Sequence, residues 1–172
     1  DNKLVRITEF THITPGNLRG IVHIKYKDLQ TGVGSQARLS PDEKIEEAYL
    51  DRRPMEYLYE DQNGYVFMDN ETFEQPTIPK ELLDGLMVYI RPNETVEIVF
   101  HDGNPVTIEL PASVVLELAE CEPAARGNTV SNVTKNAKTV TGLDIRVPNH
   151  INNGDKVKID TRTGEFLERV NS

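Results

Sequence analysis

The stretch KNAKTVTGLDIRVPNHINNGDKVKIDTRTGEF, residues 135–166, alternates short apolar runs with turn signals. One turn is expected at Thr141-Gly142, ahead of the strand-and-proline unit Ile145-Arg146-Val147-Pro148. Further turns are expected at Gly154-Asp155 and Thr163-Gly164. Glycine supplies the positive φ that tight turns need, and proline interrupts a strand ladder. Short strands separated by turns in this way indicate a small all-β domain.

The rest of the chain favours several such domains over one large core. Its 172 residues include 10 Pro, 11 Gly and no Trp. We predict three domains, at residues 1–47, 48–110 and 111–172, because Leu39–Lys44 breaks the strand pattern and begins a charged linker. A domain of about 60 residues buries only roughly 60% of its unfolded surface, so contacts between neighbouring domains should matter for stability.

The first domain carries a clear hairpin signal. Residues Ile21–Tyr26 alternate as a half-buried strand does, and they pair most simply with Leu4–Phe10. The connection contains Thr14-Pro15-Gly16-Asn17, in which proline fixes φ, glycine is free to take a positive φ, and asparagine tolerates one. Residues 13–20 should therefore form a projecting hairpin tip.

The other two domains show the same all-β pattern. Asp102-Gly103 is a short hairpin turn, Ile78–Leu86 is a short helical turn that we interpret as a plug against a barrel, and Pro123–Asn136 is a polar loop. Strands are expected at Thr95–Phe100, Val106–Leu110, Val114–Leu118, Lys156–Asp160 and Glu165–Val170.

The net charge of −9 is distributed unevenly. Residues 1–47 hold seven basic and seven acidic side chains, residues 48–110 hold four and thirteen, and residues 111–172 hold eight and eight. An acidic excess argues against bulk, non-specific RNA binding, which needs Lys and Arg to displace counterions. The first 39 residues have six basic and three acidic side chains, so this end is the one expected to face phosphates.

The chain lacks the parts of a catalytic or metal site. Its histidines stand in no ligand motif, and neither a nucleophile elbow nor a phosphate-binding glycine loop is present. A single cysteine, Cys121, excludes an internal disulfide and a thiolate zinc site, and it fits a reducing cytoplasm. No apolar run could span a bilayer. We therefore expect no catalytic residue, metal, cofactor or membrane association. The histidines are His12, His23, His101 and His150.

Two stretches resemble the bacterial elongation factor P family. Positions across residues 135–154 fall at the spacing of that family's C-terminal signature, and Met55–Tyr59 with Tyr65–Gln75 is similar to its middle-domain hairpin. The signature positions are Lys135, Ala137, Gly142, Ile145, Val147, Pro148, Ile151 and Gly154. The resemblance covers nearly the whole chain.

The resemblance implies an SH3-like (KOW-like) N-terminal barrel followed by two OB-type barrels, in an L-shaped arrangement like a tRNA. Asp1 corresponds to the turn of the family's first hairpin, so we expect the first strand to be absent and the first barrel truncated. The implied function is that of a cytoplasmic, monomeric translation factor and not an enzyme. Such a factor binds rRNA of both ribosomal subunits between the P and E sites. It stimulates peptide-bond formation at consecutive prolines by positioning the P-site peptidyl-tRNA.

In this family the first hairpin tip contacts the acceptor end of that tRNA, often through a modified lysine or a glycosylated arginine. The place of the modified residue is taken here by Asn17, and Arg19 follows two positions later. No lysine lies between Lys3 and Lys25, so Arg19 is the candidate, used bare or after action of an arginine-modifying enzyme. The expected contact loop is Pro15, Gly16, Asn17, Leu18, Arg19 and Gly20.

A second expected contact is a loop of the third domain that approaches the E-site mRNA codon in the family. Its centre here is Gly127, Asn128 and Thr129, with Ser131 beyond, where family members often have Gly-Asp-Thr. Asparagine keeps an acceptor and adds a donor, so base or backbone contacts stay possible without the negative charge. The alternative is a flexible Asn- and Ser-rich barrel loop.

Two rival functions remain open at this point. Asn17 and Asn128 would suit a paralogue that acts on other stalling sequences. A general OB-fold module for RNA or protein binding would need exposed aromatic side chains as stacking platforms. We expect the aromatic residues of the middle domain to form strand core instead. These are Tyr57, Tyr59, Tyr65, Phe67 and Phe73.

Overall fold

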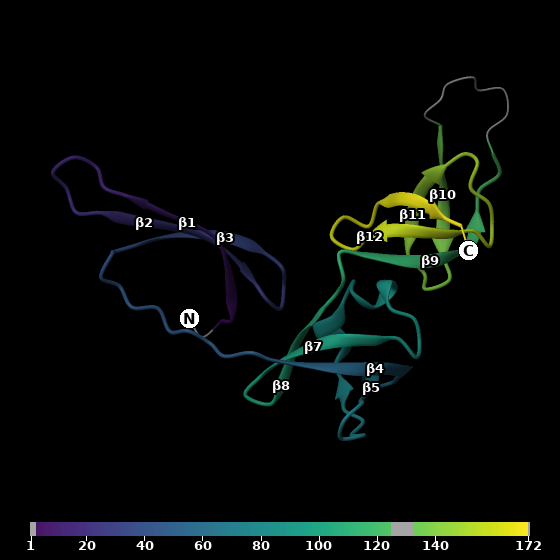
Figure 1. Ribbon diagram of the computed structural model, residues 1–172, viewed down its shortest axis with the longest axis horizontal. Helices are drawn as coiled ribbons and strands as arrows, with labels where there is room; N and C mark the ends of the chain where they lie inside the picture. Colours follow the sequence, from purple (N-terminus) through teal and green to yellow (C-terminus); the bar gives the residue numbers. More distant parts are fainter. Residues whose placement is uncertain (1–2, 125–132, 172) are drawn as a thin grey trace. The chain divides into compact units, whose positions relative to one another are not determined.

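The computed structural model describes residues 3–124 and 133–171. In this part of the chain the regular elements are strands and two short 3-10 helices, which confirms the predicted all-β class (Figure 1). No helix here is long and apolar enough to cross a bilayer. The strands form three sheets, with the orders β1-β2-β3, β6-β5-β4-β7-β8 and β11-β10-β9-β12-β13.

The elements have the following bounds: β1 Val5–Ile13, β2 Ile21–Asp28, β3 Gly34–Leu39, β4 Asp51–Asp61, β5 Gly64–Asp69, β6 Thr77–Ile78, η1 Lys80–Leu83, η2 Met87–Tyr89, β7 Thr95–His101, β8 Asn104–Glu109, β9 Ser113–Cys121, β10 Thr134–Thr139, β11 Asp144–Pro148, β12 Lys156–Asp160 and β13 Phe166–Val170.

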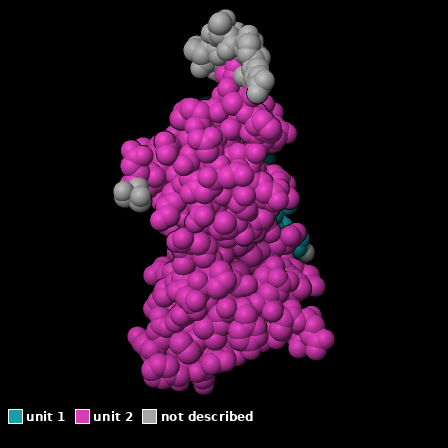
Figure 2. All heavy atoms as spheres, turned by 90° about the vertical axis from the view of Figure 1, so that its right-hand side faces the viewer, with its two compact units in different colours: residues 1–53, 98–107 teal, residues 54–97, 108–172 magenta. Residues whose placement is uncertain are grey.

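Two compact units can be distinguished within the chain (Figure 2). One contains residues 1–53 and 98–107, and the other contains residues 54–97 and 108–172. This division runs through the strands of the middle sheet and does not follow the two domain boundaries expected from the sequence. Those boundaries stay a prediction.

The first sheet is built around β2, which pairs with β1 on one side and β3 on the other, both antiparallel. The predicted hairpin is confirmed, because pairing runs from Val5 opposite Asp28 to Ile13 opposite Ile21. The expected alternation is also present, since Val22 and Ile24 are buried while Lys25 is exposed.

The middle sheet confirms only part of the expected aromatic core. Phe67 is fully buried, and its ring centroid lies 5.3 Å from that of Tyr57. The prediction is wrong for Tyr59 and Phe73, whose side chains are 53% and 69% exposed. A β-bulge between Tyr57 and Tyr59 breaks the strict alternation that would place both on one face. Phe73 lies outside the strands, in the loop after β5.

Two turns of the middle region have the conformations that their residue types predict. Asp102 and Gly103 have φ values of 50° and 78°, which is the positive-φ pair of a type I′ hairpin turn, as predicted. The expected helical turn is the 3-10 helix η1, which starts after Pro79 and buries Leu83. A second 3-10 helix, η2, was not predicted. It delivers the buried ring of Tyr89.

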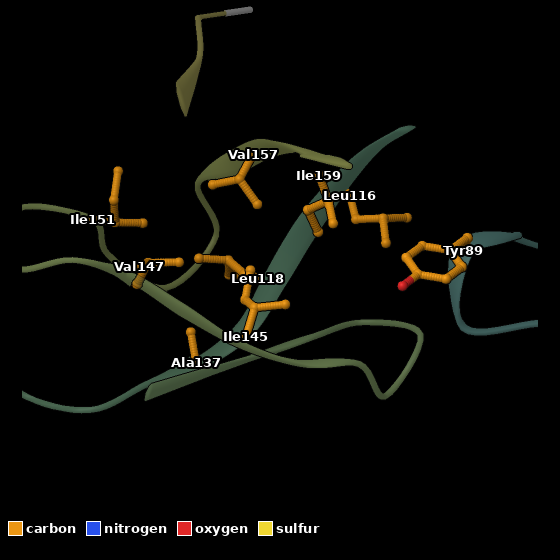
Figure 3. Packing of buried hydrophobic residues seen from close by; sticks show 9 residues of the cluster. All are labelled: Tyr89, Leu116, Leu118, Ala137, Ile145, Val147, Ile151, Val157 and Ile159. Atoms are coloured by element: carbon orange, nitrogen blue, oxygen red, sulfur yellow. The ribbon is translucent and has the colours of Figure 1, made fainter. Parts of the chain in front are cut away.

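The last sheet encloses a hydrophobic core. Its central strand β9 pairs with β10 and β12, and the end strands β11 and β13 also approach each other, as closure of a barrel requires. Tyr89 enters this cluster from outside the sheet (Figure 3). The cluster consists of Tyr89, Leu116, Leu118, Ala137, Ile145, Val147, Ile151, Val157 and Ile159.

Two parts of the last barrel lie beside Tyr89. The Thr141 hydroxyl donates to the Val88 carbonyl, next to the ring. A Cβ at Gly164 would lie 3.1 Å from the Tyr89 hydroxyl oxygen, so the turn after β12 also lies against this residue. Burial, and then the negative charge of Asp160, raise the pKa of Tyr89. A residue of the middle segment therefore completes the core of the last barrel.

Candidate functional site

The candidate site is the loop at the end of the β1–β2 hairpin. Both flanking strands stay paired up to Ile13 and Ile21, so the loop spans residues 14–20. Figure 1 shows this loop extending beyond the paired strands as the free end of the hairpin. The hydrogen-bonded strands hold the loop at a defined end of the sheet, which is how a scaffold presents a contact loop.

The tip contains a tight turn. The backbone N–H of Leu18 donates to the carbonyl of Pro15 at 3.0 Å. Of the two central residues, Gly16 has a positive φ of 47°, while Asn17 does not. Glycine at the first central position is typical of a type II′ turn, whose twist matches that of a hairpin. Local sequence therefore determines the shape of the tip, and Asn17 and Leu18 project into solvent.

The base of the tip is closely packed on one side. A Cβ at Gly20 would lie 2.6 Å from Nε2 of His12 and 3.3 Å from Cγ of Pro41. A side chain at this position, whose φ is ordinary, would therefore have to push the end of the exposed His12 side chain aside. The sequence placed His12 among surface residues and Pro41 in a linker, and only the fold brings them to the loop. Proximity to the tip in sequence was the one available signal for His12.

In the sequence, Arg19 lies between the turn at residues 15–18 and the closely packed Gly20. Its side chain is exposed, and it makes no hydrogen bond or ion pair with any residue in ranges 3–124 and 133–171. Lys25 of β2 differs in this respect because its Nζ lies 2.7 Å from Glu9 Oε2. The guanidinium of Arg19 therefore keeps its hydrogen-bonding capacity for a partner molecule, and it can hold an anion with two N–H groups at once.

The polar face of the first sheet adds further positive charge near this hairpin. His23, Lys25 and Lys27 share one face of β2, since alternate residues of a strand point the same way. The register places Arg38 of β3 opposite His23 and Arg6 of β1 opposite Lys27. Lys25, Lys27 and Arg38 are among the basic side chains of the first 39 residues that the sequence expected to face phosphates. That Arg38 lies opposite His23 was not predicted, because it depends on the register of β3.

The expected codon-contacting residues Gly127, Asn128, Thr129 and Ser131 lie outside the described residues. The stem below them is described. The Glu122 carboxylate accepts from the backbone and side-chain nitrogens of Asn136 at 3.0 and 3.1 Å, and the Glu122 N–H donates to the Asn136 carbonyl at 2.9 Å. These hydrogen bonds lower the pKa of Glu122. The two ends of the loop are thus held together where it leaves β9 and enters β10.

Three family models match successive parts of the chain. The family models described as "Elongation factor P (EF-P) KOW-like domain", "Elongation factor P (EF-P) OB domain" and "Elongation factor P, C-terminal" match residues 1–45, 50–108 and 114–169. Elongation factor P of Clostridioides difficile strain 630 is 43% identical over 170 residues, which cover 99% of this chain and 92% of the relative. The protein of the same name from Chloroflexus aggregans is 42% identical over 172 residues, covering 99% and 91%.

A solved structure shares the fold at lower identity. Eukaryotic translation initiation factor 5A from Methanococcus jannaschii superposes with a TM-score of 0.50 and 19% identity, covering 61% of this chain and 77% of that one. Its likeness supports the architecture of small β-domains in sequence. The curated relatives are named as a translation factor and not as an enzyme. On the identity and coverage of these relatives, the chain belongs to the elongation factor P family of translation elongation factors.

Proposed function

We propose that this protein binds the ribosome between the P and E sites and stimulates peptide-bond formation where consecutive prolines stall it. The observation that carries this proposal is the exposed Arg19, which has no partner among the described residues and stands on a hairpin tip shaped by Gly16. Membership of the elongation factor P family supports the same function. The protein would act in the cytoplasm, as a monomer, on the P-site peptidyl-tRNA.

The proposed mechanism is positional. Proline has a fixed φ and no backbone N–H, which makes it a poorly placed reactant. Holding the acceptor end of the tRNA in a reactive geometry lowers the orientational part of the barrier without any chemistry by the protein itself. Arg19 would hold phosphate, bare or after modification by an arginine-directed enzyme, while Pro15, Gly16 and Gly20 set the shape of the tip. Asn17 and Leu18 would contact the tRNA end directly.

The three domains expected from the sequence, 1–47, 48–110 and 111–172, would have separate tasks. The polar face of the first sheet, with Lys27 and Arg38, would contact phosphates of the tRNA or of rRNA. The loop with Gly127, Asn128 and Thr129 would reach the E-site codon and hold the factor on the small subunit. The separate ranges matched by the three family models support this division.

Reconstituted translation of a reporter with consecutive prolines tests the proposal. We expect the chain to relieve stalling, and Arg19→Ala to lose at least ten-fold of that stimulation at unchanged thermal stability. Arg162→Ala is the matched control, because Arg162 is an 80% exposed arginine of another hairpin, beside Asp160. Full stimulation by Arg19→Ala would remove the tip from the mechanism. No stimulation by the unchanged chain would reject the proposed activity.

A second candidate function is supported by Asn17, which stands at the central turn position where the family often has its modified residue. The protein would then be a paralogue of the same architecture that acts on other stalling sequences. A panel of reporters with different stalling motifs separates the two functions. Stronger relief at a motif without prolines than at consecutive prolines would favour the paralogue.

A further inference from the structure

One exposed aromatic residue has an unfavourable backbone conformation. Phe73 has a φ of 62° and is 69% exposed. The other non-glycine residues with positive φ in the described ranges are Asn93 and Asp102, whose residue types tolerate it. A bulky residue in this region is strained, and such strain is typical of functional segments.

The loop around Phe73 is held rigidly. The carboxylate of Asp69, a residue only 5% exposed, accepts from the backbone N–H groups of Glu71 at 2.8 Å and Thr72 at 3.2 Å. The Phe73 N–H donates to the Asp69 carbonyl at 2.8 Å, and the Asp69 N–H donates to the Glu74 carbonyl at 2.9 Å. These bonds impose the turn, so the ring stays in solvent.

The surroundings of the ring are acidic. Glu71 and Glu74 flank it in sequence, and both are exposed and form no ion pair with any other described residue. Carboxylates beside an apolar ring repel a phosphate backbone and attract Lys and Arg. The charge of this segment thus favours a basic protein surface over RNA.

We propose that Phe73 is a docking residue, whose ring enters an apolar pocket of a partner protein while cationic residues at the pocket rim pair with Glu71 and Glu74. This inference rests on the proposed function, so the partner is a protein component of the ribosome and not its RNA. Aromatic side chains are enriched at protein interfaces, where the rim is polar, and large anchors that fill a pocket carry much of the binding energy. The rigid loop lowers the entropy lost on binding.

Photo-crosslinking on the full 172-residue chain identifies the partner. Phe73 is replaced by p-benzoylphenylalanine, the chain is mixed with purified 70S ribosomes, and the product is analysed by mass spectrometry. The matched control carries the same group at Tyr59, which is 53% exposed on β4. We expect a crosslink to one ribosomal protein from position 73 and not from position 59. A crosslink from position 73 to rRNA would overturn the inference in favour of base stacking.

Binding of variants to 70S ribosomes separates docking from folding. We expect Phe73→Gly to raise the melting temperature, because glycine relieves the positive φ, and yet to weaken binding at least ten-fold. Phe73→Trp should bind within three-fold of the unchanged chain, while Glu71→Gln combined with Glu74→Gln should weaken binding and flatten its salt dependence.

Two negative outcomes have different meanings. Unchanged affinity of Phe73→Gly, with an unchanged chain that binds 70S ribosomes, would overturn the docking role and leave the proposed function standing. An unchanged chain that does not bind 70S ribosomes would reject the proposed function and this inference together.

Discussion

The last barrel and the first sheet use β-structure in different ways. In the barrel, β9 pairs with the next strand, β10, and also with β12, from which β10 and β11 separate it in the sequence, and the sheet surrounds a core completed by Tyr89. In the first sheet, consecutive strands pair with each other, and Val22 and Ile24 are its buried apolar residues within the described range 3–50. A hairpin can thus present a contact loop through local hydrogen bonds, whereas the barrel depends on long-range packing.

The largest effect should come from a core truncation in the barrel. Leu118→Ala removes a side chain that is 1% exposed and should reduce the free energy of unfolding by about 2–5 kcal/mol, through lost transfer energy and the cavity left behind. Ile24→Ala in the first sheet should cost less, because the residues around it are largely exposed and can close over the space. Urea denaturation followed by circular dichroism measures both. Equal losses would contradict the difference between the two regions.

Removing the ring that enters the barrel from η2 should have the next largest effect. Tyr89→Ala should cost on the order of 3 kcal/mol, because it leaves a cavity at one end of the core. NMR relaxation should then show residues 54–97 reorienting more independently of residues 108–172 than they do in the unchanged chain. Tyr89→Phe is the control, and it should keep the packing and stay within about 1 kcal/mol of the unchanged chain. Joint reorientation in the alanine variant would show that other contacts hold the segments together.

Alanine substitutions of turn glycines test the difference between the last barrel and the first sheet. Gly164 has a φ of 75°, and its Cβ would lie 3.1 Å from the Tyr89 hydroxyl oxygen, whereas Gly16 has a φ of 47° and open space around it. In both alanine variants the left-handed conformation should lower the free energy of unfolding by about 1–2 kcal/mol. In Gly164→Ala the Tyr89 hydroxyl must also be displaced. Thermal unfolding should therefore rank Gly164→Ala below Gly16→Ala in stability. The opposite order would show that the barrel can rearrange around Gly164 to accommodate a side chain.

The smallest effect concerns acid pH and the turn after β2. Asp28 accepts hydrogen bonds from the backbone N–H groups of Gln30 at 2.8 Å and Thr31 at 3.0 Å. These bonds, that of Thr31 foremost, lower the pKa of Asp28 below its ordinary 3.8. Because the folded-state pKa is the lower one, this stabilisation is present above the unfolded pKa and is lost as the pH falls through the folded value.

Asp28→Asn should therefore flatten the fall in stability of the first sheet below about pH 4. Amide hydrogen exchange at β2 and β3, measured across this pH range, reports it. An unchanged acid dependence in the variant would mean that other carboxylates account for the effect.

Residues whose role depends on nearest neighbours could be predicted. The alternation of Ile21–Tyr26, the positive φ of Gly16 and the Asp102-Gly103 turn are local properties, and the structure contains all three. The expectation failed at Tyr59, because one extra residue in a strand turns every following side chain to the other face. No local pattern marks such a bulge.

Other features follow only from packing between distant segments. The run Met87–Tyr89 is too short to predict a helix. The ring of Tyr89 is packed only when β9 to β13 have formed the core around it. The contact of Gly20 with His12 and Pro41 likewise requires the folded first sheet. Backbone preferences act over a few residues, so the order of residues could specify strands, turns and the position of Arg19 on the tip. Burial and register depend on which strands meet, so the core, the bulge and the exposed Phe73 were decided by the tertiary structure.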